Sequence, residues 1–191
     1  KISLKNTWLK PWGRLWRHKH FKTILGFLIL FPIMENMGLC LLPHFLLKQV
    51  HLNLTELAWM EKMVGMSAIL FGSLLCGVLM EKYSSRYCFI TFLACDTVAI
   101  CLFYILAMSG KHTGIIITAI MLLYLGQGAS STALATIQTR LCDKKHAASQ
   151  YALFAALHGT TRMIGPISAY IAVHLGWPIY FTLTACMSMP L

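Results

Sequence analysis

Apolar residues are grouped in six long runs, and short polar segments separate one run from the next. Since an α-helix rises about 1.5 Å per residue, roughly 20 apolar residues cross the hydrocarbon core of a bilayer. The first five runs are long enough for this, whereas the sixth is shorter. The pattern therefore predicts an all-α integral membrane protein, a six-helix transmembrane bundle over residues 21–191 whose last helix is truncated. We place the spans at about residues 21–47, 54–80, 87–108, 115–139, 149–175 and 178–191.

The composition supports a bilayer environment. Hydrophobic residues make up 58% of the chain and charged residues 12%, whereas soluble domains carry about 25% charged residues. The net charge of +10 would by itself also suit a nucleic-acid partner. Its distribution argues against nucleic acid, because seven of the 16 basic residues precede position 23 and the chain turns apolar directly after them. A basic flank beside an apolar span is typical of a juxtamembrane segment, so we expect residues 1–20 to be a cytoplasmic interfacial linker.

The other basic residues predict an orientation. With the N-terminus in the cytoplasm, cytoplasmic segments hold 12 of the 16 basic residues: seven at the start, two in residues 81–86 and three in residues 140–146. The opposite side holds two, Lys48 and Lys111, and the last two lie within spans. Because cytoplasmic loops carry the excess of Lys and Arg in membrane proteins, this bias favours a cytoplasmic N-terminus.

Sequence patterns of enzymes and metal sites are missing. The chain has no HExxH motif, no nucleophile elbow and no paired carboxylates at hydrolase spacing. Its seven cysteines include no CxxC pair and lie mostly in apolar runs, where they serve as small hydrophobic residues. We therefore expect a protein that is not an enzyme, with no catalytic residues, no metal and no cofactor.

Residues 77–86, between the second and third spans, resemble the loop motif of the major facilitator superfamily. That motif runs Gly, any, Leu, any, Asp, a basic residue, any, Gly, and then two basic residues. The matching positions are Gly77, Leu79, Lys82 and Arg86, with Glu81 in place of Asp and serines at 84 and 85. The family carries a weaker form of this motif between helices 8 and 9, and that form fits this copy. The resemblance implies that the six spans are helices 7–12, the C-terminal six-helix bundle.

The motif also implies a role. We expect Gly77 to allow close approach of two helices. Glu81, at a helix end beside Lys82 and Arg86, would then form with Gly77 a conformational latch that breaks as two halves rock. An ordinary polar turn between two spans is the alternative.

From Thr139 onward the chain resembles the AmpG-type muropeptide permeases of Gram-negative bacteria. The residues that carry the resemblance are Leu141-Cys142, 148–153, Arg162, Gly165-Pro166, Leu175-Gly176-Trp177 and Tyr180-Phe181. The family implies a proton-driven importer of anhydro-muropeptides, used in cell-wall recycling, in the bacterial inner membrane. The chain has no initiator Met, and we expect it to need the N-terminal six-helix half as its partner. An acetyl-CoA or other solute transporter of the same superfamily, or a non-transporting fragment, stays open as an alternative.

Two ionisable residues within spans are the main functional candidates, because a charge in the membrane is costly and rarely kept without a role. Glu35 lies in the middle of the first span, where it could bind and release the coupled proton. A hydrogen-bonded packing group, or a substrate contact that never titrates, is the alternative. Arg162 lies deep in the fifth span and could hold a substrate carboxylate or phosphate in bidentate fashion. A structural ion pair of Arg162 with Glu35 or another acidic residue is the alternative.

Polar residues of two further helices could complete a substrate site. At 100° per residue, Tyr151, His158 and Arg162 fall on one face of the fifth span. Gln127, Ser131 and Gln138 share a face of the fourth span and could bind a sugar or a peptide, although such residues also serve as packing contacts between membrane helices. Asp96, in the third span, is expected to lie outside the cavity and to form an interior ion pair, because the corresponding helix of the superfamily packs outside.

Overall fold

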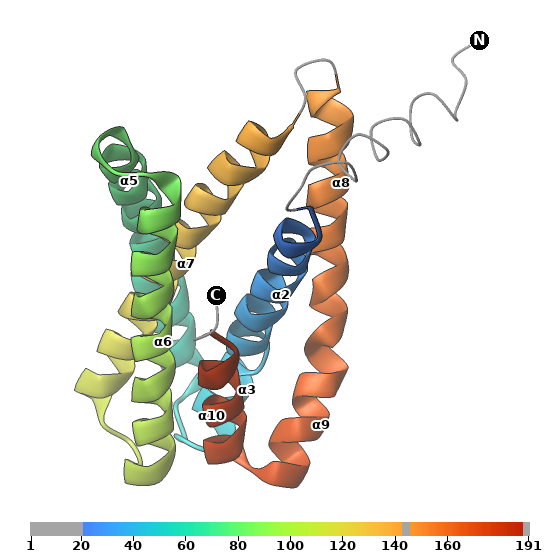
Figure 1. The fold of residues 1–191 in the computed structure, drawn as a ribbon. Helices are drawn as coiled ribbons and strands as arrows, with labels where there is room; N and C mark the ends of the chain where they lie inside the picture. Colours follow the sequence, from blue (N-terminus) through green and yellow to red (C-terminus); the bar gives the residue numbers. More distant parts are fainter. Residues whose placement is uncertain (1–20, 143–145, 189–191) are drawn as a thin grey trace.

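The computed structural model describes residues 21–142 and 146–188, and every regular element within them is a helix (Figure 1). The expected linker at residues 1–20 lies outside the described residues. The elements are α2 (Phe21–Cys40), α3 (Leu42–Lys48), α4 (Leu54–Trp59), the π-helix η1 (Met60–Gly65), α5 (Met66–Lys82), α6 (Ser85–Ser109), α7 (Thr113–Leu141), α8 (Ala147–Thr160), the 3₁₀ helix η2 (Thr161–Ile164), α9 (Gly165–Leu175) and α10 (Trp177–Ser188). The predicted all-α membrane fold is confirmed.

Four helical stretches in the described residues are long and apolar enough to cross a membrane. They are Ile29–Lys48, Leu54–Lys82, Ser85–Ser109 and Thr113–Leu141. The fifth expected span is not one regular helix, because η2 separates α8 from α9. The cause is local: Pro166 has no N–H for the carbonyl of Arg162, and the N–H of Gly165 bonds to that carbonyl instead. A bond over three residues rather than four tightens the turn into a 3₁₀ helix.

The helices form two groups that α10 joins (Figure 1). In the first group, α7 packs extensively against both α5 and α6. In the second, α2 packs against α8, η2 and α9, which run down one side of the molecule. Because α10 contacts α6, α9 and α2, it closes the bundle at the end where α3 also lies. Left-handed Gly176, with φ of 83°, makes the sharp turn from α9 into α10.

Two apolar clusters stabilise this arrangement. The Phe45 cluster, at the α3 and α10 end, includes Phe45 and Phe181, whose ring centroids are 4.9 Å apart in an edge-to-face geometry. The Phe31 cluster occupies the other end and includes Phe31 and Phe89, with ring centroids 4.8 Å apart. Edge-to-face pairs of this kind contribute about 0.5–1.5 kcal/mol beyond the burial of their surface. Each cluster draws residues from α2, α6 and α7, so each ties the two helix groups together.

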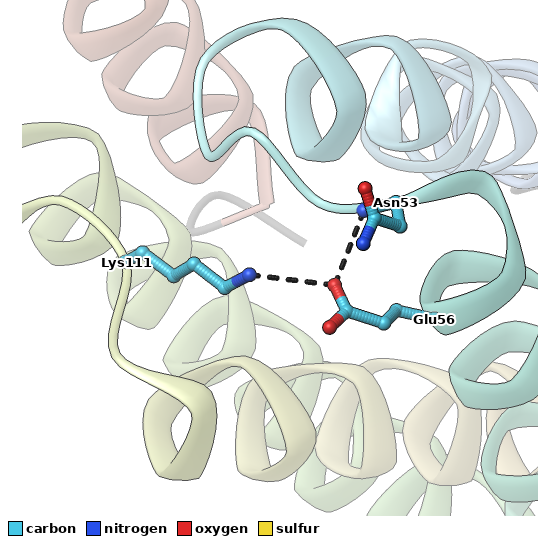
Figure 2. A network of polar contacts seen from close by, with 3 residues as sticks. All are labelled: Asn53, Glu56 and Lys111. Carbon is cyan, nitrogen blue, oxygen red and sulfur yellow. Dashed lines mark hydrogen bonds and ion pairs between the residues drawn. The ribbon is translucent and has the colours of Figure 1, made fainter.

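One exposed ion pair links the first turn of α4 to the loop between α6 and α7 (Figure 2). The carboxylate oxygen Oε2 of Glu56, in α4, accepts a hydrogen bond from the backbone N–H of Asn53 at 3.1 Å and from Lys111 Nζ at 3.3 Å. The first bond caps the start of α4. Since both charged side chains are more than two-fifths exposed, water and salt screen the pair and it contributes little to stability.

The contact between α5 and α7 is made by glycines. A Cβ at Gly72 would overlap the carbonyl of Leu125, and a Cβ at Gly128 would overlap the carbonyl of Ile69. Ser73 adds a hydrogen bond from its hydroxyl to the carbonyl of Gly128, at 3.0 Å. Close approach of this kind is the usual way for membrane helices to gain packing contacts without large side chains.

Gly77 was expected to allow close approach of two helices, and among the described residues it does not. Gly77 is exposed, and a Cβ at this position would meet no atom within 4 Å. The close approach occurs five residues earlier in the same helix, at Gly72, because that face of α5 is the one turned toward α7.

These contacts predict a difference between two glycine substitutions. Gly128→Ala should destabilise the protein by about 1–3 kcal/mol, since the added methyl group must push the α5 backbone away. Gly77→Ala, in the same pair of helices, should change stability by less than about 0.5 kcal/mol. Thermal unfolding of the detergent-solubilised protein measures both. Equal stabilities of the two variants would contradict the glycine contact.

Candidate functional site

A small cavity lies where α2, α6 and α7 meet. Its volume of about 10 Å³ is close to the minimum that one water molecule requires. It is lined by Met34, Glu35, Gly38, Leu39, Asp96, Ile100, Leu123 and Gln127. We call it the central cavity. Three of these residues are polar, one from each helix, in a bundle whose other lining residues are apolar or glycine.

The polar residues present oxygens that have no hydrogen-bond partner. These are Glu35 Oε2, Asp96 Oδ1 and Gln127 Oε1, each of which is buried. The side chain of Gln127 is within hydrogen-bonding reach of the Glu35 carboxylate. Because buried polar atoms in folded proteins nearly always have a partner, three such oxygens around one cavity mark it as the leading candidate for a functional site.

The interior ion pair expected for Asp96 is not found among the described residues. Asp96 is 5% exposed and lines the central cavity, and it forms no ion pair with any described residue. Its carboxylate lies against Gly126 of α7, where a Cβ would overlap it. Phe92 and Ala99 are also buried, at helical spacing on the same face of α6, so Asp96 belongs to the inner face.

Arg162 is placed by the irregular turn η2. Its side chain is exposed, and it makes no ion pair with a described carboxylate, although it is near enough to Glu35 to act on it electrostatically. His158 is partly buried near the end of α8. Tyr151 lies near the start of the same helix and is 41% exposed. The 3₁₀ helix η2 begins between His158 and Arg162, yet the two residues are near enough to interact electrostatically.

The residues predicted on α7 lie at different depths. Gln127 lines the central cavity, Ser131 is partly buried, and Gln138 is 7% exposed, about three turns further along. The hydroxyl of Ser131 donates to the carbonyl of Gly128 at 3.1 Å. Of the three, the structure therefore brings only Gln127 together with Glu35.

The loop-motif residues lie on the surface. Glu81, Lys82 and Arg86 are exposed, and none forms an ion pair with another described residue. Ser84, which departs from the motif, begins α6 as its N-cap, and its hydroxyl accepts a hydrogen bond from the N–H of Tyr87 at 3.4 Å. Serine is among the preferred residues for this position.

A polar link between α2 and η2 was not expected from the sequence. The amide nitrogen of Asn36 donates to the carbonyl of Pro32 at 2.7 Å and to the hydroxyl of Thr161 at 3.1 Å. The hydroxyl of Thr161 in turn donates to the carbonyl of His158 at 2.6 Å. The link joins the turns that hold Glu35 and Arg162, so it fixes their relative position.

The link predicts an energetic coupling between Asn36 and Thr161. Asn36→Ala and Thr161→Val each remove one partner, so the cost of the double variant should fall short of the sum by about 0.5–1.5 kcal/mol. Unfolding free energies in detergent micelles measure the cycle. As a matched control, Asn36→Ala should be additive with Thr160→Val, since the exposed Thr160 bonds only to the carbonyl of Leu157. Additivity in both cycles would show that the Asn36–Thr161 bond contributes nothing.

Sequence comparison with known proteins identifies the family of this chain. Residues 23–191 match the Major Facilitator Superfamily. A putative transporter AmpG 1 of Rickettsia bellii is 32% identical over 185 residues, covering 95% of this chain and 44% of the relative. The anhydromuropeptide permease of Escherichia coli is 24% identical over 168 residues, covering 87% of this chain and 34% of the relative. The similarity confirms the resemblance to AmpG-type proteins, of which the chain spans less than half the length. With its several membrane-spanning helices, the chain belongs to the major facilitator superfamily of multi-pass membrane proteins.

Proposed function

We propose that this chain is the C-terminal half, helices 7–12, of a proton-coupled importer of anhydro-muropeptides in the bacterial inner membrane. The observation that carries the proposal is the position of Glu35, a carboxyl group beside Gln127 in a small cavity within the helix bundle. The names of the similar proteins support the choice of solute. Alternating access requires two halves that rock about a site near the membrane midplane, so the N-terminal half is the necessary partner.

Glu35 is proposed to carry the proton. An ionised carboxylate is costly in a membrane interior, and a protonated one is not, so the protonation state of Glu35 can decide which conformations are accessible. The central cavity next to it has room for about one water molecule, which could pass the proton when the site opens.

Arg162 is proposed to bind an acidic group of the solute. Its guanidinium is exposed and has no ion-pair partner among the described residues, so it is available for a carboxylate of the muropeptide peptide. A bidentate contact of this kind is strong and geometrically specific. His158 and Tyr151 of α8, and Gln127, Ser131 and Gln138 of α7, would add hydrogen bonds to sugar and peptide groups. Such an activity moves a solute without altering its bonds and uses no catalytic residue or cofactor.

Glu81, Lys82 and Arg86 are proposed to form the cytoplasmic latch with the missing half. Their exposure and lack of partners in the described residues leave their charges free for residues of another helix bundle. The segment before α2 would be the cytoplasmic linker between the halves.

Uptake by membrane vesicles tests the function and its two main residues. We expect vesicles with the full-length protein to accumulate labelled anhydro-muropeptide when an inward proton gradient is imposed. Arg162→Ala should raise the KM about 10- to 100-fold, because a hydrogen bond to a charged group contributes about 1.5–3 kcal/mol. Glu35→Gln, which cannot release a proton, should abolish accumulation.

Arg140→Ala is the matched control for Arg162, since Arg140 is also exposed but lies at the far end of α7. It should leave uptake unchanged. Absence of uptake by a correctly inserted wild-type protein would exclude the muropeptide, and labelled acetyl-CoA would then be the next solute to test.

The orientation predicts which loops face the cell exterior. Lys111→Cys, in the α6–α7 loop, should react with a membrane-impermeant maleimide in intact cells, above the level of the wild-type protein. Arg140→Cys should react only after the cells are permeabilised. The reverse pattern would place the start of the chain outside the cytoplasm.

A further inference from the structure

The two carboxyl groups of the central cavity, those of Glu35 and Asp96, have fewer hydrogen-bond donors around them than they could accept. An ionised carboxylate only accepts hydrogen bonds, and Glu35 Oε2, Asp96 Oδ1 and Gln127 Oε1 all lack a donor. The amide group of Gln127 serves the other side of Glu35. Ser130 is within hydrogen-bonding reach of Asp96, but its hydroxyl donates to the carbonyl of Gln127 at 3.3 Å. The site therefore has more acceptors than donors.

Counter-charges from the surrounding helices do not replace the missing donors. Arg162 of η2 acts on Glu35 electrostatically without forming an ion pair, and His158 lies next to Arg162 rather than to the cavity. From α10, the hydroxyl of Tyr180 bonds to the carbonyl of Met37. From α6 itself, Cys95 adjoins Asp96 and supplies no positive charge. The element α5 packs on the far side of α7 with Cys76 as its buried titratable group.

Two negative charges so close together in an apolar bundle would repel each other strongly, since little water screens them. A single added proton changes this balance. One carboxyl becomes a donor, the repulsion is removed, and the new O–H can serve an oxygen that had no partner. Glu35 and Asp96 line the same small cavity and are near enough to act on each other electrostatically, so the protonation state of one carboxyl affects the other.

We propose that Glu35 and Asp96 hold one proton between them and act as a coupled pair, so that Asp96 is a second proton-binding residue of the transporter. This inference rests on the proposed proton coupling and extends it from Glu35 alone to a pair. Protonation transfers H⁺ from water to one carboxylate, and release returns it when the cavity opens. Gly126 is part of the arrangement, because a side chain there would displace the Asp96 carboxylate.

Infrared spectroscopy of the purified full-length protein tests the pair without any substrate. The C=O band of protonated carboxyl groups is followed as a function of pH. Coupled sites titrate in two steps that belong to the pair, so the wild-type band should show two steps separated by at least about one pH unit. Asp96→Asn and Glu35→Gln should each leave one step, at a pH between the two wild-type steps.

Independent sites give a different result. If the remaining carboxyl titrates in each variant at the same pH as in the wild-type protein, the two residues do not share a proton and the proposal is overturned. Asp96→Asn reports the titration of Glu35, and Glu35→Gln reports the titration of Asp96. If one variant does not fold, the other still tests the coupling. Glu56→Gln, an exposed carboxyl far from the cavity, should keep both steps. A band that is removed by Na⁺ at constant pH would also overturn the proposal, because the site would then hold a metal ion.

A transport measurement separates this inference from the proposed function. Asp96→Asn should lose gradient-driven accumulation at least tenfold while keeping solute exchange at equal concentrations within about twofold, since exchange needs no net proton transfer. A structural role of Asp96 would reduce both in proportion to the folded fraction. If the wild-type protein transports no muropeptide, the proposed solute fails, and the infrared titration still decides whether the pair exists.

Discussion

An oxygen atom buried in a membrane bundle must find a donor or remain unsatisfied, and this requirement organises the centre of the protein. Glu35, Asp96 and Gln127 lie at one level of three helices. Along each helix, residues on one side of that level belong to the Phe31 cluster and residues on the other side to the Phe45 cluster. The two apolar clusters pack the helices on either side of this polar layer, and in such surroundings an unpaired polar atom is costly.

The helix α7 makes this layer possible. It contacts α5 through Gly72 and Gly128, and it gives Asp96 its place beside Gly126. Glycines therefore serve two purposes along one helix. Some allow backbones to touch, and one leaves room for a carboxylate that a methyl group would exclude. Both purposes depend on which face of α7 each glycine occupies, and the positions 126 and 128 are two residues apart on different faces.

The sequence was sufficient for the fold and for part of the site. Apolar runs predict the helices because a bilayer leaves few other ways to satisfy a backbone, and Glu35 and Gln127 stand out as costly polar residues within them. The contact of Asp96 with Gly126 was not predicted, because α6 is apolar around most of its circumference and its sequence does not mark one inner face. The irregular turn at Arg162 follows from Pro166, yet regular helical geometry was assumed through it.

Other features could not be read from the sequence. Whether Gly77 or Gly72 meets a neighbouring helix depends on the angle at which α5 crosses α7, and sequence alone does not specify that angle. The bond between Asn36 and Thr161 joins residues 125 positions apart, so the sequence around either residue does not predict it. Long-range polar contacts of this type depend on the packed structure, which must exist before the two groups can meet.

The glycine contact between α5 and α7 has a mechanical consequence. Two backbones that touch directly have no side chains between them to slide or repack, so these helices behave as a rigid plate. Bending is then left to the places where the hydrogen-bond ladder is irregular. On the opposite wall these are Leu41, between α2 and α3, and Thr161–Ile164, between α8 and α9, while on the α5 side the π-helix η1 precedes the glycine contact. Glu35 and Arg162 both lie on this more flexible wall. Gln127 lies on α7, which is part of the rigid plate, and Asp96 lies on α6, which packs against α7. Any widening of the central cavity would thus increase the distance between the carboxyl groups of Glu35 and Asp96.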